Sequence, residues 1–224
     1  MTAEHNIAGF RLGIYIFEDA EIVDFSAPYG VLSVARRWDP SIDVFFIAES
    51  MRPVQAQAGF TVLPNYSFND LPALDAFLIP GGAGTRQETF NRRLHQYIRD
   101  LPDSTILAGL CTGPWVYAQM GLLEGLTATA RKEGDPQELS SRGMIPIDRL
   151  AALAPNAKIS RARIVDAGRI ITAAGISSGM ELGFYLLRRA GFEESFLREV
   201  ARVMEYLDAY DLRKGSLEIA SAIQ

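Results

Sequence analysis

Cys111 is the residue in this 224-residue chain whose type and setting best suit covalent chemistry. It directly follows an apolar run, residues 104–110, that predicts a buried strand, and a helix is predicted from about Gly113. In open α/β sheets, ligands bind outside the carboxyl ends of the strands. The first turn of a helix at that edge offers unpaired N–H groups and a partial positive charge, which stabilise a thiolate. The position therefore predicts a cysteine nucleophile with a lowered pKa.

Glycines flank this cysteine at equal distances. Gly109 and Gly113 make a G-x-C-x-G pattern, which is similar to the turn that thrusts a nucleophile out of a strand–helix junction. Small neighbours let the backbone pass close by, and Pro114 suits the first turn of the helix. The alternative is an inert core residue, because free cysteine is among the most buried residue types.

The elements around Cys111 predict an α/β fold. Strands expected at 11–17, 42–48, 75–80 and 104–110 alternate with helices, which indicates a doubly wound, mostly parallel sheet with helices on both faces. Turn residues at Ala58-Gly59 and Asp166-Ala167-Gly168 predict two hairpins. Other helices are expected at 24–34, 90–100 (capped by Asn91), 175–189 and 193–207. The expected organisation is a flexible N-terminus (1–9), one domain (10–207) and a C-terminal extension (208–224).

Composition narrows the classes of function. The apolar fraction of 48% fits a globular protein, and a net charge of −5 speaks against binding to nucleic acid or an anionic membrane. No apolar run reaches the roughly 20 residues of a membrane span, and the first residues do not read as a signal peptide, so a cytoplasmic location is expected. The sequence has neither zinc-ligand spacing nor a G-x-G-x-x-G fingerprint, so no metal or other cofactor is expected.

Histidine is scarce, which limits the mechanism. His5 lies near the N-terminus and His95 lies in a predicted amphipathic helix, so neither is expected beside the thiol. A protease-type triad needs an imidazole in contact with the nucleophile. The sequence therefore predicts no peptidase activity.

Four short motifs together resemble the ThiJ/PfpI family, whose fold is like that of the class I glutamine amidotransferases and of flavodoxin. They occur in the family's order and span nearly the whole chain: D-F-S-A-P-Y-G-V-L (24–32), I-P-G-G (79–82), A-G-L-C-T-G (108–113) and A-A-G-I-S-S-G-M-E-L (173–182). Peptidase-like members carry histidine directly after the cysteine, where this chain has Thr112.

Within that family, the C-T-G motif together with Asp24 is similar to the isocyanide hydratases. The resemblance implies that Cys111 is the nucleophile, that Asp24 performs acid–base steps and that Thr112 supports the site. It also implies that Gly81 and Gly82 supply backbone donors beside the nucleophile. Ser177 is expected either to line the substrate pocket or to cap the following helix, as is its neighbour Ser178.

Simpler roles remain open for the other site residues. Asp24 and Thr112 could each cap a helix, and Gly81-Gly82 could form a plain tight turn. After the fifth strand the hydratases usually carry His-Trp, whereas this chain has T-A-T-A-R-K-E-G (127–134). Arg131 or Lys132 would suit an anionic substrate there, or both could be solvated.

The functional expectation is a cysteine-dependent hydratase or hydrolase of a small molecule, forming a thioimidate if the substrate is an isocyanide. The alternatives are a ligand-sensing domain related to those fused to transcription regulators, and a redox-responsive protein in which Cys111 is oxidised. The resemblance also implies a homodimer. Substrate identity is left open by the altered 131–134 segment.

Overall fold

The computed structural model describes residues 9–70, 72–134, 143–214 and 217–220. An eight-stranded sheet runs through this part of the chain. In spatial order its strands are β12 (Leu217–Ile219), β10 (Ile164–Asp166), β11 (Ile170–Ala173), β7 (Ile106–Leu110), β6 (Ala76–Ile79), β1 (Arg11–Tyr15), β2 (Asp43–Ala48) and β5 (Tyr66–Ser67). All neighbouring pairs are parallel except β10 with β11.

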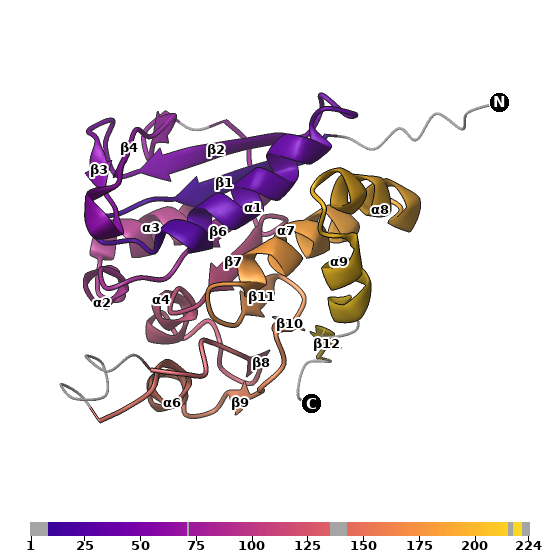
Figure 1. Ribbon diagram of the computed structural model, residues 1–224. Coiled ribbons are helices and arrows are strands. Elements are labelled where there is room, and N and C mark those ends of the chain that lie inside the picture. Colours follow the sequence, from indigo (N-terminus) through magenta and orange to yellow (C-terminus); the bar gives the residue numbers. More distant parts are fainter. Residues whose placement is uncertain (1–8, 71, 135–142, 215–216, 221–224) are drawn as a thin grey trace.

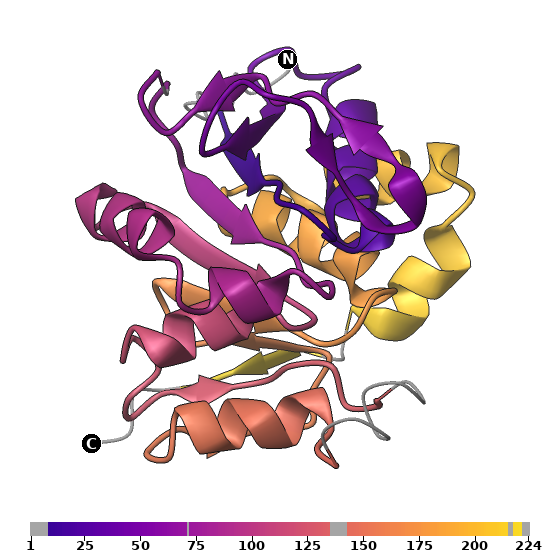
Figure 2. The ribbon, with the colours of Figure 1, turned by 90° about the vertical axis from the view of Figure 1, so that its left-hand side faces the viewer.

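Helices cover both faces of the sheet, which confirms the predicted doubly wound arrangement (Figures 1 and 2). One face carries α1 (Ile22–Ala35), α7 (Ser178–Arg189) and α8 (Glu194–Val203), with α9 (Leu207–Arg213) beside α8. The other carries α2 (Thr85–Glu88), α3 (Arg92–Asp100), α4 (Pro114–Gln119) and α6 (Pro146–Leu153). Because both faces are covered, the central strands β6 and β7 read as nearly continuous apolar runs rather than alternating ones.

Local signals in the sequence correspond to the observed turns and caps. The Asn91 side chain caps α3 by accepting hydrogen bonds from the N–H groups of Arg93 and Leu94, at 3.0 and 3.2 Å. The hairpin predicted at Asp166-Ala167-Gly168 joins β10 to β11. The hairpin predicted around Ala58-Gly59 joins β3 (Val54–Gln55) to β4 (Thr61–Val62) through a short 3₁₀ turn, Gln57–Gly59. A further small pair is β8 (Thr127–Ala128) with β9 (Lys158–Ile159).

The C-terminal part differs from the expectation. The helix predicted to reach residue 207 ends at Val203, because Glu205 takes a left-handed conformation with φ 51°. The chain then forms α9 and continues to β12, which pairs with β10 in the main sheet. The described residues beyond 207 thus contact α8 and the main sheet, whereas the sequence led us to expect a separate extension there. Residues 1–8 lie outside the part that the structure describes.

The carboxyl ends of β1, β6, β7 and β11 point to one edge of the sheet, because these strands are parallel. The segments that leave this edge begin at Ile16, Pro80, Cys111 and Ala174. The motifs at 79–82, 108–113 and 173–182 therefore meet in one region of the fold, and the second of them contains Cys111.

Candidate active site at the carboxyl edge of the sheet

Cys111 occupies a strained turn between β7 and α4. Its φ is 61°, a left-handed conformation that costs a residue with a side chain about 1–2 kcal/mol. Its N–H donates to the carbonyls of Ala173 and Ala174, at 3.1 and 3.2 Å, which ties the turn to the end of β11. A Cβ on Gly113 would lie 2.1 Å from the Ile79 carbonyl oxygen, so the chain can pass there only with glycine. The sharp turn that the flanking glycines predict between strand and helix is present.

The surroundings of the Cys111 thiol favour its neutral form. Cys111 is only 3% exposed, and this burial, reinforced by the nearby Asp24 carboxyl, raises the pKa of the thiol well above its usual value. Arg131 and the N–H of Ile176 lower the pKa, but less strongly. The expectation of a lowered thiol pKa was wrong, because it considered the helix end and could not include the depth of burial or the facing carboxyl.

Asp24 lies in the first turn of α1 with its side chain completely buried. It does not cap the helix: the residue before the helix is Glu21, and Asp24 Oδ2 instead accepts a hydrogen bond from the N–H of Gly81 at 2.8 Å. Burial raises the pKa of Asp24 to about 7, a rise that Glu21 reinforces and that the Gly81 N–H, the Cys111 thiol and Arg131 oppose. Oδ1 makes no hydrogen bond of ordinary geometry with the described residues.

Thr112 and the two glycines after β6 hold the site together. Thr112 Oγ1 accepts from the N–H of Gly82 at 3.2 Å and donates to Oγ1 of Thr85, in α2, at 2.9 Å. Within this structure, the N–H groups of Gly81 and Gly82 thus serve Asp24 and Thr112. A Cβ on Gly81 would lie 2.7 Å from Thr112 Oγ1 and 2.8 Å from Asp24 Oδ2. The close approach of these groups requires glycine.

Ser177 stands apart from these groups. It is exposed at the start of α7, and its hydroxyl accepts a hydrogen bond from Arg163 at 3.1 Å. The neighbouring Ser178 is buried, and its Oγ has no hydrogen-bond partner among the described residues. The group of this segment that interacts with the thiol is the N–H of Ile176. Sequence reasoning did not single out Ile176, although its motif marks the segment, because a backbone donor has no signal in residue type.

The two cations of the segment after β8, Arg131 and Lys132, have different partners. Arg131 lies beside the reactive pair: its N–H donates to the Cys111 carbonyl at 3.0 Å, and its positive charge lowers the pKa of both the thiol and Asp24. Lys132 turns elsewhere and donates to the Ala162 carbonyl at 3.0 Å. Of the two cations considered from the sequence, Arg131 is the one that acts on the site.

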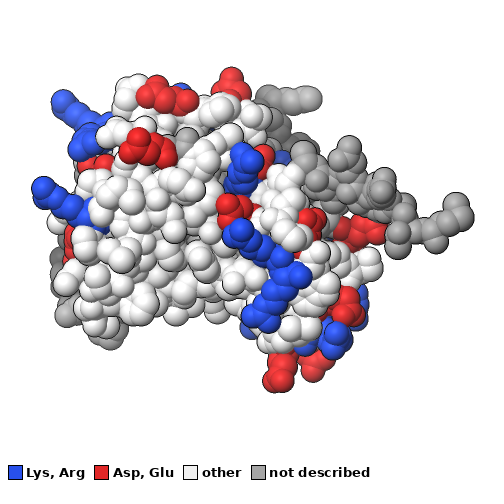
Figure 3. Space-filling view, turned by 90° about the horizontal axis from the view of Figure 1, so that it is seen from above, with Lys and Arg blue, Asp and Glu red and all other residues white. Residues whose placement is uncertain are grey.

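Neither a metal-binding cluster nor a membrane-spanning helix is found among the residues that the structure describes. No group of three or more potential metal-binding side chains lies together there, and no helix in that part is long and apolar enough to cross a membrane. Acidic and basic side chains are interspersed on the face seen from above, with broad uncharged areas between them (Figure 3). That face therefore has no extended field of one sign.

The residues of this site all lie within a stretch of the chain that matches a known protein family. The model of the DJ-1/PfpI family matches residues 11–189, which include all of these groups. The chain belongs to the DJ-1/PfpI family. The match confirms the resemblance to ThiJ/PfpI proteins inferred from the motifs.

This DJ-1/PfpI member is similar in sequence to two proteins of different function, an enzyme and a transcriptional regulator. It is 26% identical over 212 residues to an isonitrile hydratase of Pseudomonas putida, covering 94% of this chain and 84% of that protein. It is 27% identical over 105 residues to the HTH-type transcriptional regulator GbdR of Pseudomonas aeruginosa, covering 44% of this chain but 29% of the regulator.

A solved structure supports the same fold. A ThiJ/PfpI family protein from Pseudomonas syringae superposes with a TM-score of 0.73 at 18% identity, covering 96% of this chain and 95% of that one. At this identity, the likeness establishes the architecture of the DJ-1/PfpI member and carries no information on its substrate.

Proposed function

We propose that this protein is a cysteine-dependent hydratase that converts a small isocyanide to an N-substituted formamide. The observation that supports this best is the pairing of a protonated thiol with a buried carboxyl whose pKa is raised to about 7. A group with a pKa near the working pH can both accept and return a proton within one catalytic cycle. The similarity to an isonitrile hydratase over 94% of the chain supports the same chemistry.

The chemistry needs one proton in each direction. The ionised Asp24 carboxylate takes the proton of the Cys111 thiol while sulfur attacks the isocyanide carbon. Asp24 then delivers that proton to the same carbon, which gives a thioimidate, R–N=CH–S–Cys. Water adds to this carbon, a proton moves to the nitrogen, and the C–S bond breaks. The products are R–NH–CHO and the free thiol, so the net reaction is addition of one water.

Each neighbour has a defined part in this scheme. The Ile176 N–H and Arg131 lower the thiol pKa and so stabilise the sulfur when it becomes anionic. Thr112 keeps the loop after β6 in contact with the turn that carries Cys111. Gly81 holds Asp24 Oδ2, which leaves Oδ1 as the oxygen that exchanges the proton.

The test is turnover of a panel of small alkyl and aryl isocyanides, with formamide measured by NMR for the wild type, Cys111→Ser and Lys132→Gln. We expect formamide from the wild type and from Lys132→Gln, and none above background from Cys111→Ser. Mass spectrometry of a stopped reaction should show an adduct of the isocyanide mass on the wild type and on Lys132→Gln, and none on Cys111→Ser. Turnover that survives in Cys111→Ser would overturn the proposal.

A ligand-sensing role is the second candidate, favoured by the similarity to the regulator GbdR over 105 residues. In this case a small molecule would bind near Cys111 without being consumed. Saturable binding of an isocyanide or formamide with no turnover, unchanged in Cys111→Ser, would favour sensing. The redox-responsive alternative is not favoured, because oxidation-sensing thiols are exposed and have a low pKa, whereas Cys111 is 3% exposed and its pKa is raised.

A further inference from the structure

A cleft lies where α7 and α9 meet β10 and β12, and Cys111 is not among its lining residues. It has a volume of about 410 Å³, including the space open to solvent. Its walls are apolar side chains that are almost fully buried, Phe184, Tyr185 and Tyr210, together with Ile164 and Leu217. The remaining lining residues are charged: Arg163, Glu181, Arg188, Arg213 and Lys214. We call this site the α7–α9 cleft.

Positive charge exceeds negative charge in the cleft. Four of its lining residues are cationic, and Glu181 is the one acidic residue among them. Glu181 is shared by two of these cations, Arg163 at 3.0 Å and Arg213 at 3.2 Å. A carboxylate that two guanidinium groups share leaves them with a net positive charge. This excess is local, since the whole chain has a net charge of −5.

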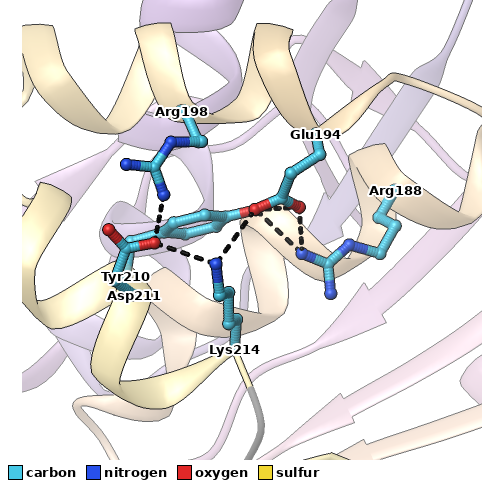
Figure 4. Close-up of polar contacts among 6 residues, drawn as sticks. All are labelled: Arg188, Glu194, Arg198, Tyr210, Asp211 and Lys214. Carbon is cyan, nitrogen blue, oxygen red and sulfur yellow. Dashed lines mark hydrogen bonds and ion pairs between the residues drawn. The ribbon is translucent and has the colours of Figure 1, made fainter.

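At the rim of the cleft, cations again contact carboxylates that they share, as Figure 4 shows. Arg188 contacts Glu194 and the Tyr210 hydroxyl, both at 2.8 Å, and Lys214 lies 3.0 Å from Asp211. Arg198 also pairs with Asp211 but is not one of the residues that line the cleft. These contacts come from α7, α8 and α9, so the cations are held in position by three separate elements.

The guanidinium groups retain donors for a ligand. Among the described residues, Arg213 bonds through Nη1 and Arg188 through Nη2. Their remaining N–H groups can bind a carboxylate, whose two oxygens match the planar fork of a guanidinium. Both side chains are about one-third exposed, which leaves them accessible from solvent. The aromatic and aliphatic walls provide a surface for an apolar group beside that carboxylate.

We infer that the α7–α9 cleft binds a small organic anion, namely a carboxylate attached to a compact apolar or aromatic body. The site is distinct from the proposed active site, because Cys111 and Asp24 do not line it. Arg163 connects the two: its side chain bonds to Ser177 and its carbonyl accepts from the N–H of Ala174 at 2.8 Å, next to the residues that hold Cys111.

Calorimetric titration of the full chain at low salt tests the inference, with benzoate as the probe and benzyl alcohol as its uncharged analogue. We expect saturable binding of benzoate and none of benzyl alcohol at the same concentrations. Arg213→Gln removes a lining cation while Glu181 keeps Arg163 as partner, so the fold is retained and benzoate binding should weaken about tenfold or more. Arg198→Gln is the matched control: it removes a cation of the same cluster that does not line the cleft, and binding should change less than about twofold.

Two further measurements test whether binding depends on the active site and on the apolar part of the ligand. Cys111→Ser should bind benzoate as the wild type does, whatever the outcome of the isocyanide assay, so this site and the proposed activity are tested separately. Sulfate should compete only weakly, because it has no apolar body. The inference is overturned if benzyl alcohol or sulfate binds as well as benzoate, if binding needs Cys111, or if Arg198→Gln and Arg213→Gln weaken it equally. Absence of saturable binding would also overturn it.

Discussion

The surroundings of Cys111 and the α7–α9 cleft differ in how their polar groups are buried and bonded. Around Cys111 the polar groups are buried and bound by backbone N–H groups: Gly81 donates to Asp24, and Gly82 donates to Thr112. In the cleft the cations are partly exposed and share carboxylates, as Arg163 and Arg213 share the buried Glu181. The first region therefore depends on every contact, whereas the second can lose one and keep its shape. Single substitutions should separate the two regions by the size of their effects.

The largest effect is expected from Asp24→Asn. The amide can still accept the Gly81 N–H, so the fold is kept, but it cannot carry the proton between sulfur and carbon. Loss of general acid–base help typically lowers a rate by about 10²–10⁴-fold. Isocyanide turnover by the variant, compared with Cys111→Ser, measures this. Activity within a few-fold of the wild type would remove Asp24 from the mechanism.

Stability should depend on pH through the same residue. The pKa of Asp24 rises from 3.8 to about 7 on folding. Between these values the folded state binds more protons than the unfolded state, so the free energy of unfolding should fall as pH rises from about 4 to about 7 and then level off. The slope attributable to one group is at most about 1.4 kcal/mol per pH unit. Urea unfolding at several pH values should show that Asp24→Asn removes this component, and an unchanged slope would contradict the buried-acid assignment.

Two glycines test how tightly the site is packed. In Gly81→Ala the new Cβ would lie 2.8 Å from Asp24 Oδ2, so unfolding free energy should fall by about 1–3 kcal/mol and turnover should drop with it. Gly30 lies inside α1, and an added Cβ would meet nothing within 4 Å. Gly30→Ala should therefore stabilise the protein by about 0.5–1 kcal/mol and leave turnover unchanged. Equal effects at both positions would show that the close approach at Gly81 is not needed.

A smaller effect is expected from the charge beside the thiol. Arg131 lowers the pKa of Cys111, so Arg131→Gln should raise that pKa and slow alkylation by iodoacetamide several-fold at alkaline pH. Lys132→Gln is the control, because Lys132 binds the Ala162 carbonyl instead. A shift of the alkylation profile in Lys132→Gln alone would reverse the assignment of the two cations.

These residues also show how far the sequence could be interpreted. Cys111 and Thr112 directly follow a predicted strand of a parallel sheet, which places them at the edge where ligands bind. The resemblance to ThiJ/PfpI proteins added Asp24 to the same site, and the structure brings the three residues together. The sequence could not predict the raised thiol pKa, since burial depends on packing by distant elements. The α7–α9 cleft had no signal either: residues 163, 181 and 213 share no local pattern, and only the tertiary fold unites them.

The smallest effect is expected at the rim of the cleft. Arg198 and Asp211 form an ion pair in which both side chains are more than one-third exposed. Water screens such exposed pairs, so Arg198→Gln should shift the urea midpoint of unfolding less than any other substitution compared above. Lys214 also pairs with Asp211 and limits the loss further. A loss as large as that of Gly81→Ala would show that the two regions do not differ as described.

The short strand β12 has a consequence for self-association. It pairs with β10 from Ile164 to Asp166 and so occupies what would otherwise be a free edge of the main sheet. Its Glu218 accepts a hydrogen bond from Ser160 and lies 4.0 Å from Lys158, which adds charge to the new edge. Short, charged outer strands discourage chains from adding to a sheet. β12 thus protects the edge of β10. Without it, β10 could pair with strands of other molecules, and aggregation would compete with folding.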